Sequence, residues 1–266
     1  MLFSEHLVVI RGGGDLGTGA AYRLRQAGFP VVVLELAEPL AIRRAVAVSS
    51  AVDTGRMSVE GVDAVRAESV GAALELARAG SIAVLVSPGL PDTLDRSVVV
   101  DARLAKANLD TRIDDAPLVV ALGPGFTAGI DCDAVVETMR GHHLGRVIWE
   151  GPAAPNTGRP GVVGGASSQR VIRSSRAGTV AWDIRIGDTV AAGDVLGRVA
   201  GAPIESVIGG VARGLIAAGR EVSAGTKIAD VDPRGDRTAC FEISDKSLAV
   251  GGGVLEAVLV HLNEGS

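Results

Sequence analysis

The sequence predicts an α/β protein in which a parallel-sheet domain is followed by a small all-β domain and a C-terminal helix. Short apolar runs alternate with glycine-rich loops in the first part of the chain, a repeat of glycines and valines follows, and the last segment is apolar and helical in pattern. The length of 266 residues suffices for two domains. We expect a parallel-sheet domain at residues 1–150 and a linker or ligand-facing loop at 151–170. A β domain should follow at 171–233, and the segment 234–266 should pack back on the first domain.

The composition excludes several functional classes. A net charge of -5 with 26 basic residues gives neither a basic face for nucleic acid nor a polybasic membrane patch, and no apolar run approaches the roughly 20 residues that span a bilayer. We expect a cytoplasmic protein with small-molecule and protein partners, and the sequence leaves open whether it forms a homo-oligomer. Cys132 and Cys240 predict two reduced thiols rather than a disulfide framework, and no metal site is predicted.

The N-terminal segment predicts a strand, a glycine loop, a helix and a second strand. The strands cover residues 6–10 and 31–34, and the helix covers 18–27. The glycine loop has the spacing G-x-G-x-x-G, and an acid lies about 20 residues downstream, where it can accept a hydrogen bond from a ribose hydroxyl. This pattern predicts a Rossmann-like nucleotide-binding domain. The cofactor-binding candidates here are Gly12, Gly13, Gly14, Asp15, Gly17 and Glu35.

Asp15 limits what the glycine loop establishes. Its carboxylate would lie beside the ligand phosphates, so it either caps the helix or requires a ligand that brings a metal ion. The loop therefore predicts a nucleotide more firmly than it predicts NAD.

Further buried strands are expected at residues 82–86, 98–100 and 118–122, with a helix from about 131 to 140. Because the carboxyl ends of parallel strands share one edge, the loops after them should border the same crevice as the glycine loop. The polar and loop residues predicted there are the catalytic candidates Asp101 and Glu137 and the cofactor-binding candidates Arg43, Gly123, Gly125 and Phe126. Surface ion pairs and helix caps are the alternative interpretation of the charged ones.

Two copies of a repeat follow one another with an offset of 32 residues. The first copy runs from Gly178 to Val199 and the second from Gly210 to Val231. Its pattern, G-x5-I-x2-G-x2-V-x2-G-x5-V, predicts two similar β halves. It resembles the lipoyl/biotinyl fold, a barrel-sandwich hybrid. Such domains carry a lysine on the hairpin between the halves, but the hairpin at 199–204 has none, and Lys227 falls in the terminal strand. A carrier role is therefore rejected in favour of a docking or lid module, or of a repeat kept for packing alone.

The tail carries the third catalytic candidate, Lys246. It precedes the glycines at 251–253, where a phosphate or an acidic substrate could be held, although a solvated lysine is the alternative. An apolar helix is expected from residue 254 to about 262.

Together the motifs resemble the YqeB-type accessory proteins of selenium-dependent molybdenum hydroxylases. The matching stretches include VIRGGGDLGTG, VVVDARLAKANLDT, ALGPGFTAGIDCDAVVETMRGHHLGRV and ISDKSLAVGGGVLEA. The resemblance covers nearly the whole chain. It implies a role in maturing a molybdenum hydroxylase by handling its molybdenum cofactor, a pterin dinucleotide, or its selenium ligand. XdhC-type chaperones, similar in function, also hold a pterin cofactor on a Rossmann-like domain.

Two other functions stay open. An NAD(P)-dependent oxidoreductase would use the same glycine loop, with Glu35 favouring NAD over NADP, but no Tyr-Lys or His-Asp arrangement supplies its proton. A non-catalytic protein that senses a nucleotide is the third hypothesis. The sequence does not decide whether any reaction is catalysed.

Overall fold

The computed structural model describes residues 1–158 and 161–265, and the chain divides into two compact units. The larger unit contains residues 1–39, 47–156 and the tail from 243 onward. The smaller unit contains residues 40–46 and 157–242. Residues 159 and 160, within the expected linker, lie outside the described part. Each unit has its own hydrophobic core.

A nine-stranded sheet organises the larger unit, in the order β10-β9-β7-β6-β1-β2-β5-β4-β3. Its strands are β1 (Val8–Arg11), β2 (Val31–Glu35), β3 (Arg56–Val59), β4 (Val62–Ala67), β5 (Ile82–Val86), β6 (Val98–Asp101), β7 (Leu118–Leu122), β9 (Ala134–Val136) and β10 (Val147–Ile148). The pairs β3–β4 and β9–β10 are antiparallel and the other pairs are parallel. The strand order reverses where β1 lies between β2 and β6. The predicted α/β class with a mostly parallel sheet is confirmed.

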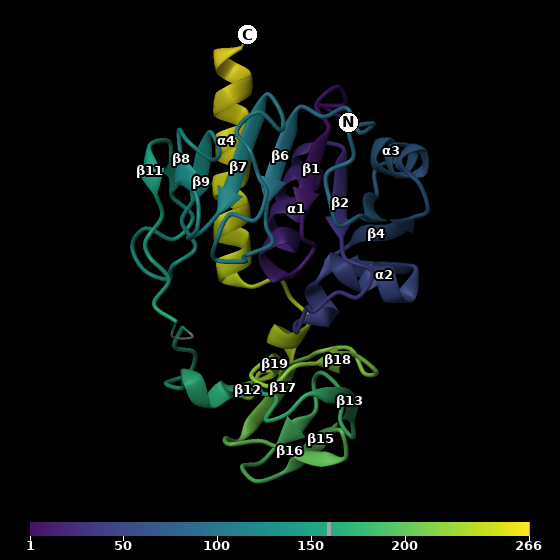
Figure 1. The fold of residues 1–266 in the computed structure, drawn as a ribbon, viewed down its shortest axis with the longest axis vertical. Coiled ribbons are helices and arrows are strands. Elements are labelled where there is room, and N and C mark those ends of the chain that lie inside the picture. The colour runs from purple at the N-terminus through teal and green to yellow at the C-terminus, as the bar shows by residue number, and fades with distance from the viewer. Residues whose placement is uncertain (159–160, 266) are drawn as a thin grey trace. The chain divides into compact units, whose positions relative to one another are not determined.

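Helices and loops cover both faces of this sheet, which explains why its central strands are apolar throughout. On one face, α1 (Asp15–Ala27) lies beside α4 (Asp245–Glu264), over the side chains of Val8, Ile10, Val120 and their neighbours (Figure 1). The other face packs against α3 (Val70–Ala79) and against a second apolar cluster around Phe126. A short α2 (Ala51–Thr54) precedes β3.

The helix expected from 131 to 140 is wrong. Ala134–Val136 forms β9, in parallel register with β7 so that Val120 lies opposite Ala134. The Asp133 carboxylate accepts a hydrogen bond from the Val119 N–H at 2.7 Å, which holds the start of the strand. Two β-branched residues, Val135 and Val136, are fully buried there. Sheet pairing and β-branching therefore outweigh the apolar spacing that suggested a helix.

The C-terminal helix is longer than expected. It begins at Asp245, capped by the Ser244 hydroxyl, and contains the three glycines at 251–253 in its interior. Gly251 touches the Gly19 backbone of α1, and Gly253 touches the Gly145 backbone, so a Cβ at either position would collide with main chain. Gly251 and Gly253 therefore allow close packing of the helix, and the expected start of the helix at residue 254 is wrong. The binding of a phosphate or an acidic substrate by Lys246 stays a prediction.

The smaller unit consists of two four-stranded antiparallel sheets. One has the order β12-β19-β17-β14 and the other has the order β16-β15-β13-β18. The strands are β12 (Val171–Arg173), β13 (Gly178–Trp182), β14 (Thr189–Val190), β15 (Val195–Val199), β16 (Ala202–Glu205), β17 (Gly210–Leu215), β18 (Glu221–Val222) and β19 (Lys227–Asp232). The 32-residue offset relates β13 to β17, β14 to β18 and β15 to β19.

The two halves of the repeat exchange strands. β14 of the first half pairs with β17 of the second, and β18 of the second half pairs with β13 of the first. Ile204, Ile216 and Ile228 lie in the shared core between the sheets. The hairpin turns at Ala200 and Gly201, both with positive φ, as a two-residue turn of type I′ requires. The turn carries no lysine, and Lys227 lies in β19.

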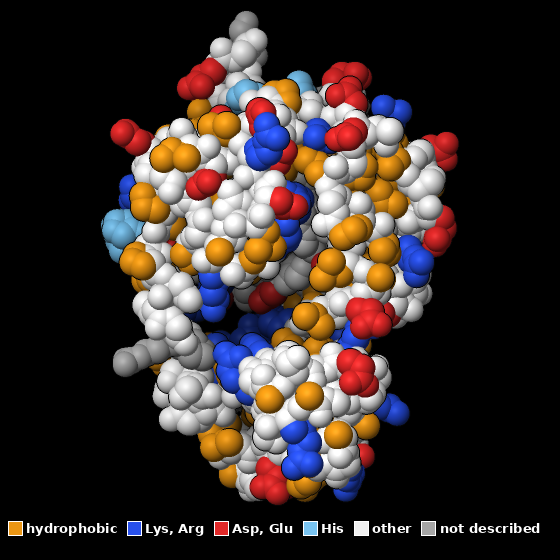
Figure 2. All heavy atoms as spheres, in the orientation of Figure 1, with side chains coloured by type: hydrophobic (Ala, Val, Ile, Leu, Met, Phe, Trp, Pro, Cys, Tyr) orange, Lys and Arg blue, Asp and Glu red, His pale blue; other side chains and the backbone are white. Residues whose placement is uncertain are grey.

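The surface mixes charges of both signs. On the face drawn in Figure 2, acidic and basic side chains are interspersed among apolar ones. Among the described residues, no helix is both long and apolar enough to cross a membrane.

Candidate functional site

The three glycines of the G-x-G-x-x-G pattern have three different environments, two of them in the loop between β1 and α1 and the third, Gly17, in the first turn of α1. Gly12 has φ +98°, which favours glycine. A Cβ on Gly17 would collide with the Gly12 carbonyl oxygen, so this position must be glycine for the loop to close on the helix. A Cβ on Gly14 would meet nothing within 4 Å. Two of the glycines thus shape the turn, and the third faces open space.

Gly14 is the N-cap residue of α1, and no side chain caps the helix there. The first turn of a helix presents N–H groups and a partial positive charge, which together favour an anion. Asp15 does not supply the cap. Its carboxylate accepts a hydrogen bond of 2.9 Å from the Ser247 hydroxyl of α4, which holds it toward that helix. Asp15 therefore helps to attach α4 instead of capping α1, and the alternative of a ligand that brings a metal ion stays a prediction.

Glu35 ends β2 beside the glycine loop. One of its carboxylate oxygens accepts a hydrogen bond from the Gly13 N–H and the other accepts one from its own neighbour, the Leu36 N–H, both at 2.8 Å. The carboxylate thus fixes the middle of the loop. Each oxygen has a second lone pair, which leaves capacity for a ribose hydroxyl.

Asp101 ends β6, directly opposite Arg11 at the end of β1. Its side chain is buried and accepts hydrogen bonds from Arg103 and from the Thr111 hydroxyl, each at 2.6 Å. The glycine loop and Asp101 therefore lie at the carboxyl ends of adjacent strands, where the strand order reverses. Open α/β sheets bind their ligands at such a point.

The loop after β7 is built from close backbone contacts. Gly123 and Gly125 both have positive φ, and a Cβ on Gly125 would collide with the backbone of Lys106 and Ala107. The Gly125 carbonyl accepts a hydrogen bond from the Asn108 N–H. Phe126 is only 3% exposed and packs in the core under β6 and β7, so its ring is a core element.

Glu137 and Lys246 occupy other positions in the larger unit. Glu137 follows β9 and is buried, and its carboxylate accepts hydrogen bonds from the Met139 and Ala154 N–H groups at 2.6 and 2.8 Å. It therefore ties two loops together. Lys246 lies in the first turn of α4.

Arg43 belongs to the smaller unit, where it is buried and donates hydrogen bonds to the carbonyls of Ala239 and Glu242. Both cysteines are buried. Burial, with the charges of Asp131 and Asp133, raises the pKa of the Cys132 thiol to about 12, which keeps it protonated at neutral pH and unsuited to nucleophilic chemistry.

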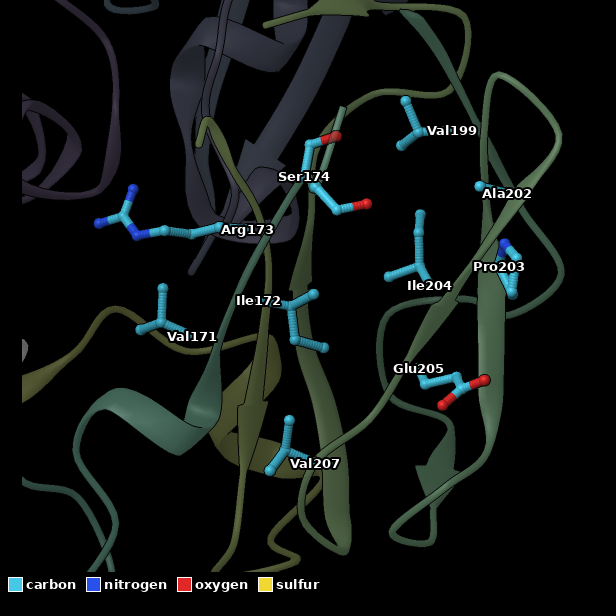
Figure 3. Close-up of a pocket in the computed structure, with 11 residues that line it drawn as sticks. Val171, Ile172, Arg173, Ser174, Val199, Ala202, Pro203, Ile204, Glu205 and Val207 are labelled. Atoms are coloured by element: carbon cyan, nitrogen blue, oxygen red, sulfur yellow. The ribbon is translucent and has the colours of Figure 1, made fainter. Parts of the chain in front are cut away.

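The smaller unit has a groove of about 260 Å³ between β12 and β16, two strands that the repeat offset relates to one another (Figure 3). Ile172 and Ile204 line its base, and Arg173 and Glu205 lie on its two strands. Its polar lining consists of Arg173, Ser174, Ser175 and Glu205.

Three residues of the candidate site were not singled out from the sequence: Arg11, Asp110 and Thr111. Arg11 is 3% exposed although it is charged, and it donates hydrogen bonds to Asp110 and to Thr111 at 2.7 and 2.9 Å. An arginine at the end of an apolar strand was the available signal. The loop that carries Asp110 and Thr111 has no periodicity from which its path could be inferred.

No family model matches the chain. It is 49% identical over 263 residues to a protein of Escherichia coli (strain K12) named "Uncharacterized protein YqeB", and it is a homologue of that protein. The alignment covers 98% of this chain and 49% of the relative, so the chain spans about half of the relative's length.

Three solved structures show weak likeness. A succinylglutamate desuccinylase/aspartoacylase of Rhodobacter sphaeroides is 23% identical, with 25% of this chain and 22% of that chain covered and a TM-score of 0.21. The ectoine utilization protein EutE (DoeB) of Ruegeria pomeroyi is 12% identical, with 84% and 56% covered and a TM-score of 0.23. An aspartoacylase family protein of Mesorhizobium loti is 12% identical, with 85% and 84% covered and a TM-score of 0.29. At these TM-scores the likenesses carry no conclusion.

Proposed function

We propose that this chain is an accessory protein that binds a pterin dinucleotide at the glycine loop and helps to mature a molybdenum hydroxylase in the cytoplasm. The observation that carries the proposal is the open space beside Gly14 at the N-terminus of α1. A ligand pyrophosphate can approach the backbone there and accept hydrogen bonds from the first-turn N–H groups.

The arrangement of the strands supports a nucleotide ligand. The five central strands run in the order β5-β2-β1-β6-β7, or 3-2-1-4-5 when numbered among themselves, and this order, with the glycine loop at the point of reversal, supports a Rossmann-like domain. Glu35 lies at the end of the second strand, where it can accept a hydrogen bond from a ribose hydroxyl while it holds the Gly13 N–H. The resemblance to accessory proteins of molybdenum hydroxylases supports a pterin dinucleotide as the ligand.

The smaller unit is proposed to contact the hydroxylase. Its two strand-exchanged halves support a barrel-sandwich hybrid of the lipoyl/biotinyl type, and the absence of a lysine from the Ala200–Gly201 turn argues against covalent cofactor transport. Cross-linking of the co-produced pair should then join the hydroxylase to residues of the smaller unit. Cross-links confined to the larger unit would contradict this part of the proposal.

Native mass spectrometry of the protein, purified from a host that synthesises molybdenum cofactor, tests the ligand. We expect an adduct with the mass of a pterin dinucleotide. An adduct of NAD(H) or NADP(H) without a pterin would overturn the proposal in favour of an oxidoreductase. A protein that retains no small molecule, even when the hydroxylase is absent, would count against cofactor delivery.

A further inference from the structure

Two arginines at the reversal point share one exposed carboxylate. Asp110 accepts a hydrogen bond from Arg11 and forms an ion pair with Arg103, each with an N–O distance of 2.7 Å. The Arg11 side chain is 4% exposed and the Arg103 side chain is 19% exposed, whereas the Asp110 side chain is 54% exposed. A carboxylate on the solvent side thus covers two guanidinium groups that lie deeper.

The charges in this cluster balance only when Asp110 is in place. Asp101 lies beneath, with its side chain 1% exposed, and is held by Arg103 and Thr111. Two guanidinium groups and two carboxylates give a net charge of zero. Without Asp110 the cluster would carry one net positive charge in a partly buried position, where it would attract an anion.

The loop that brings Asp110 to this place has an unusual backbone. Leu104 and Lys106 adopt positive φ values of 55° and 64°, which residues with a Cβ rarely adopt. Such conformations cost free energy and persist where surrounding contacts impose them. The ion pairs of Asp110 hold the chain four residues after Lys106, so their release would remove a restraint on the end of this loop.

We propose that Asp110 stands in for a phosphate group of the ligand, and that Arg11 and Arg103 bind this phosphate when Asp110 withdraws. Guanidinium groups match phosphate oxygens in paired, charge-assisted hydrogen bonds, and a phosphate carries at least the charge of the carboxylate that it replaces. The inference deepens the proposed function and rests on it for the identity of the rest of the ligand. The exchange would couple ligand binding to movement of the loop at 102–110.

The pKa directions agree with this pairing. Burial opposes ionisation of Asp110, but hydrogen bonds and charges from Arg103 and Arg11 lower its pKa below the usual 3.8. Burial likewise lowers the pKa of Arg103, but Asp101 and Asp110 raise it above its usual value. At neutral pH the Asp110 carboxylate is therefore ionised, and it competes with an incoming anion for Arg11 and Arg103.

The test measures binding of inorganic pyrophosphate by calorimetry to the wild type, Asp110→Asn, Asp114→Asn and Arg103→Gln. Asp114 is the matched control, because it lies on the same loop and pairs with Arg112 on the surface, with both side chains exposed. Asp110→Asn should bind about tenfold more tightly than the wild type, a factor that equals ~1.4 kcal/mol. Asp114→Asn should match the wild type, and Arg103→Gln should bind more weakly.

Equal affinities of Asp110→Asn and Asp114→Asn would overturn the inference, as would unchanged binding by Arg103→Gln. A thermal scan of each variant with and without pyrophosphate checks that it is folded. The same titration is repeated with malonate, a dicarboxylate. Tighter binding of malonate than of pyrophosphate would overturn the assignment of the site to phosphate. If native mass spectrometry finds a pterin dinucleotide while Asp110→Asn has no effect, the inference fails and the proposed function stands.

Discussion

Gly14 at the N-cap of α1 and Gly17 in its first turn belong to one glycine pattern but serve different purposes. Gly17 is in contact with the Gly12 carbonyl, so its missing Cβ is a packing requirement, whereas Gly14 borders open space. The G-x-G-x-x-G spacing predicted the loop, but it could not tell these roles apart, because a sequence pattern does not record what each Cα faces. The same limit applies to Phe126, which follows the glycines of the β7 loop yet points into the core.

Gly17→Ala should destabilise the protein by about 1–3 kcal/mol, because the added methyl group forces the loop and α1 apart. Gly14→Ala is the control at the N-cap of the same helix, where a Cβ meets nothing within 4 Å, and it should change the free energy of unfolding little. Urea denaturation measures both. Equal stabilities of the two variants would contradict the packing role of Gly17.

Asp110 should contribute to the dependence of stability on pH. Its pKa in the folded protein lies below the usual 3.8, so its stabilising effect is present above that pH and is lost as the pH falls through the folded value. Urea midpoints from pH 6 down to pH 3 should therefore fall less steeply for Asp110→Asn than for the wild type. Parallel curves would show that the ion pairs with Arg11 and Arg103 contribute nothing to folding.

At the scale of elements, the C-terminal helix α4 packs against α1 through close backbone contacts. Gly19 on α1 and Gly251 on α4 touch directly, and the Ser247 hydroxyl donates to both the Asp15 carbonyl and its carboxylate. The sequence predicted a helix that packs back on the first domain. It did not predict where the helix begins, because three successive glycines disfavour a helix by propensity. Two of them, Gly251 and Gly253, allow the close packing of this helix.

Gly251→Ala should lower the thermal midpoint, since its Cβ would collide with the Gly19 carbonyl. Gly252→Ala is the matched control one residue away, where a Cβ meets nothing within 4 Å. That substitution should raise the stability by about 0.5–1 kcal/mol through the higher helix propensity of alanine. The prediction fails if the two variants shift the midpoint in the same direction.

The other elements show what periodicity can and cannot predict. The repeat predicted two β halves, because equal spacing of glycines and valines reports equal local structure. It gave no information on strand exchange, which depends on contacts between residues far apart in the chain. For the same reason, β9 was mistaken for a helix, since its assignment depends on pairing with β7.

For the molecule as a whole, the mostly parallel sheet was predictable from its apolar runs and glycine loops. The site was predictable in part, because a parallel sheet brings the loops after its strands to one edge. The pairing of Arg11 with Asp110 was not, since the 102–117 loop folds through irregular contacts. The division into units was also more complex than a linear order, because residues 40–46 belong with the smaller unit.

The central claim is that a dinucleotide binds at the N-terminus of α1. It is tested most directly by native mass spectrometry of Gly14→Asp beside the wild type, with Ser69→Asp at the N-cap of α3 as the matched control. An aspartate at an N-cap stabilises a helix but occupies the place of a ligand anion. We expect Gly14→Asp to lose the ligand while its thermal midpoint stays at or above that of the wild type, and Ser69→Asp to keep the ligand. Full retention of the ligand by folded Gly14→Asp would contradict the account.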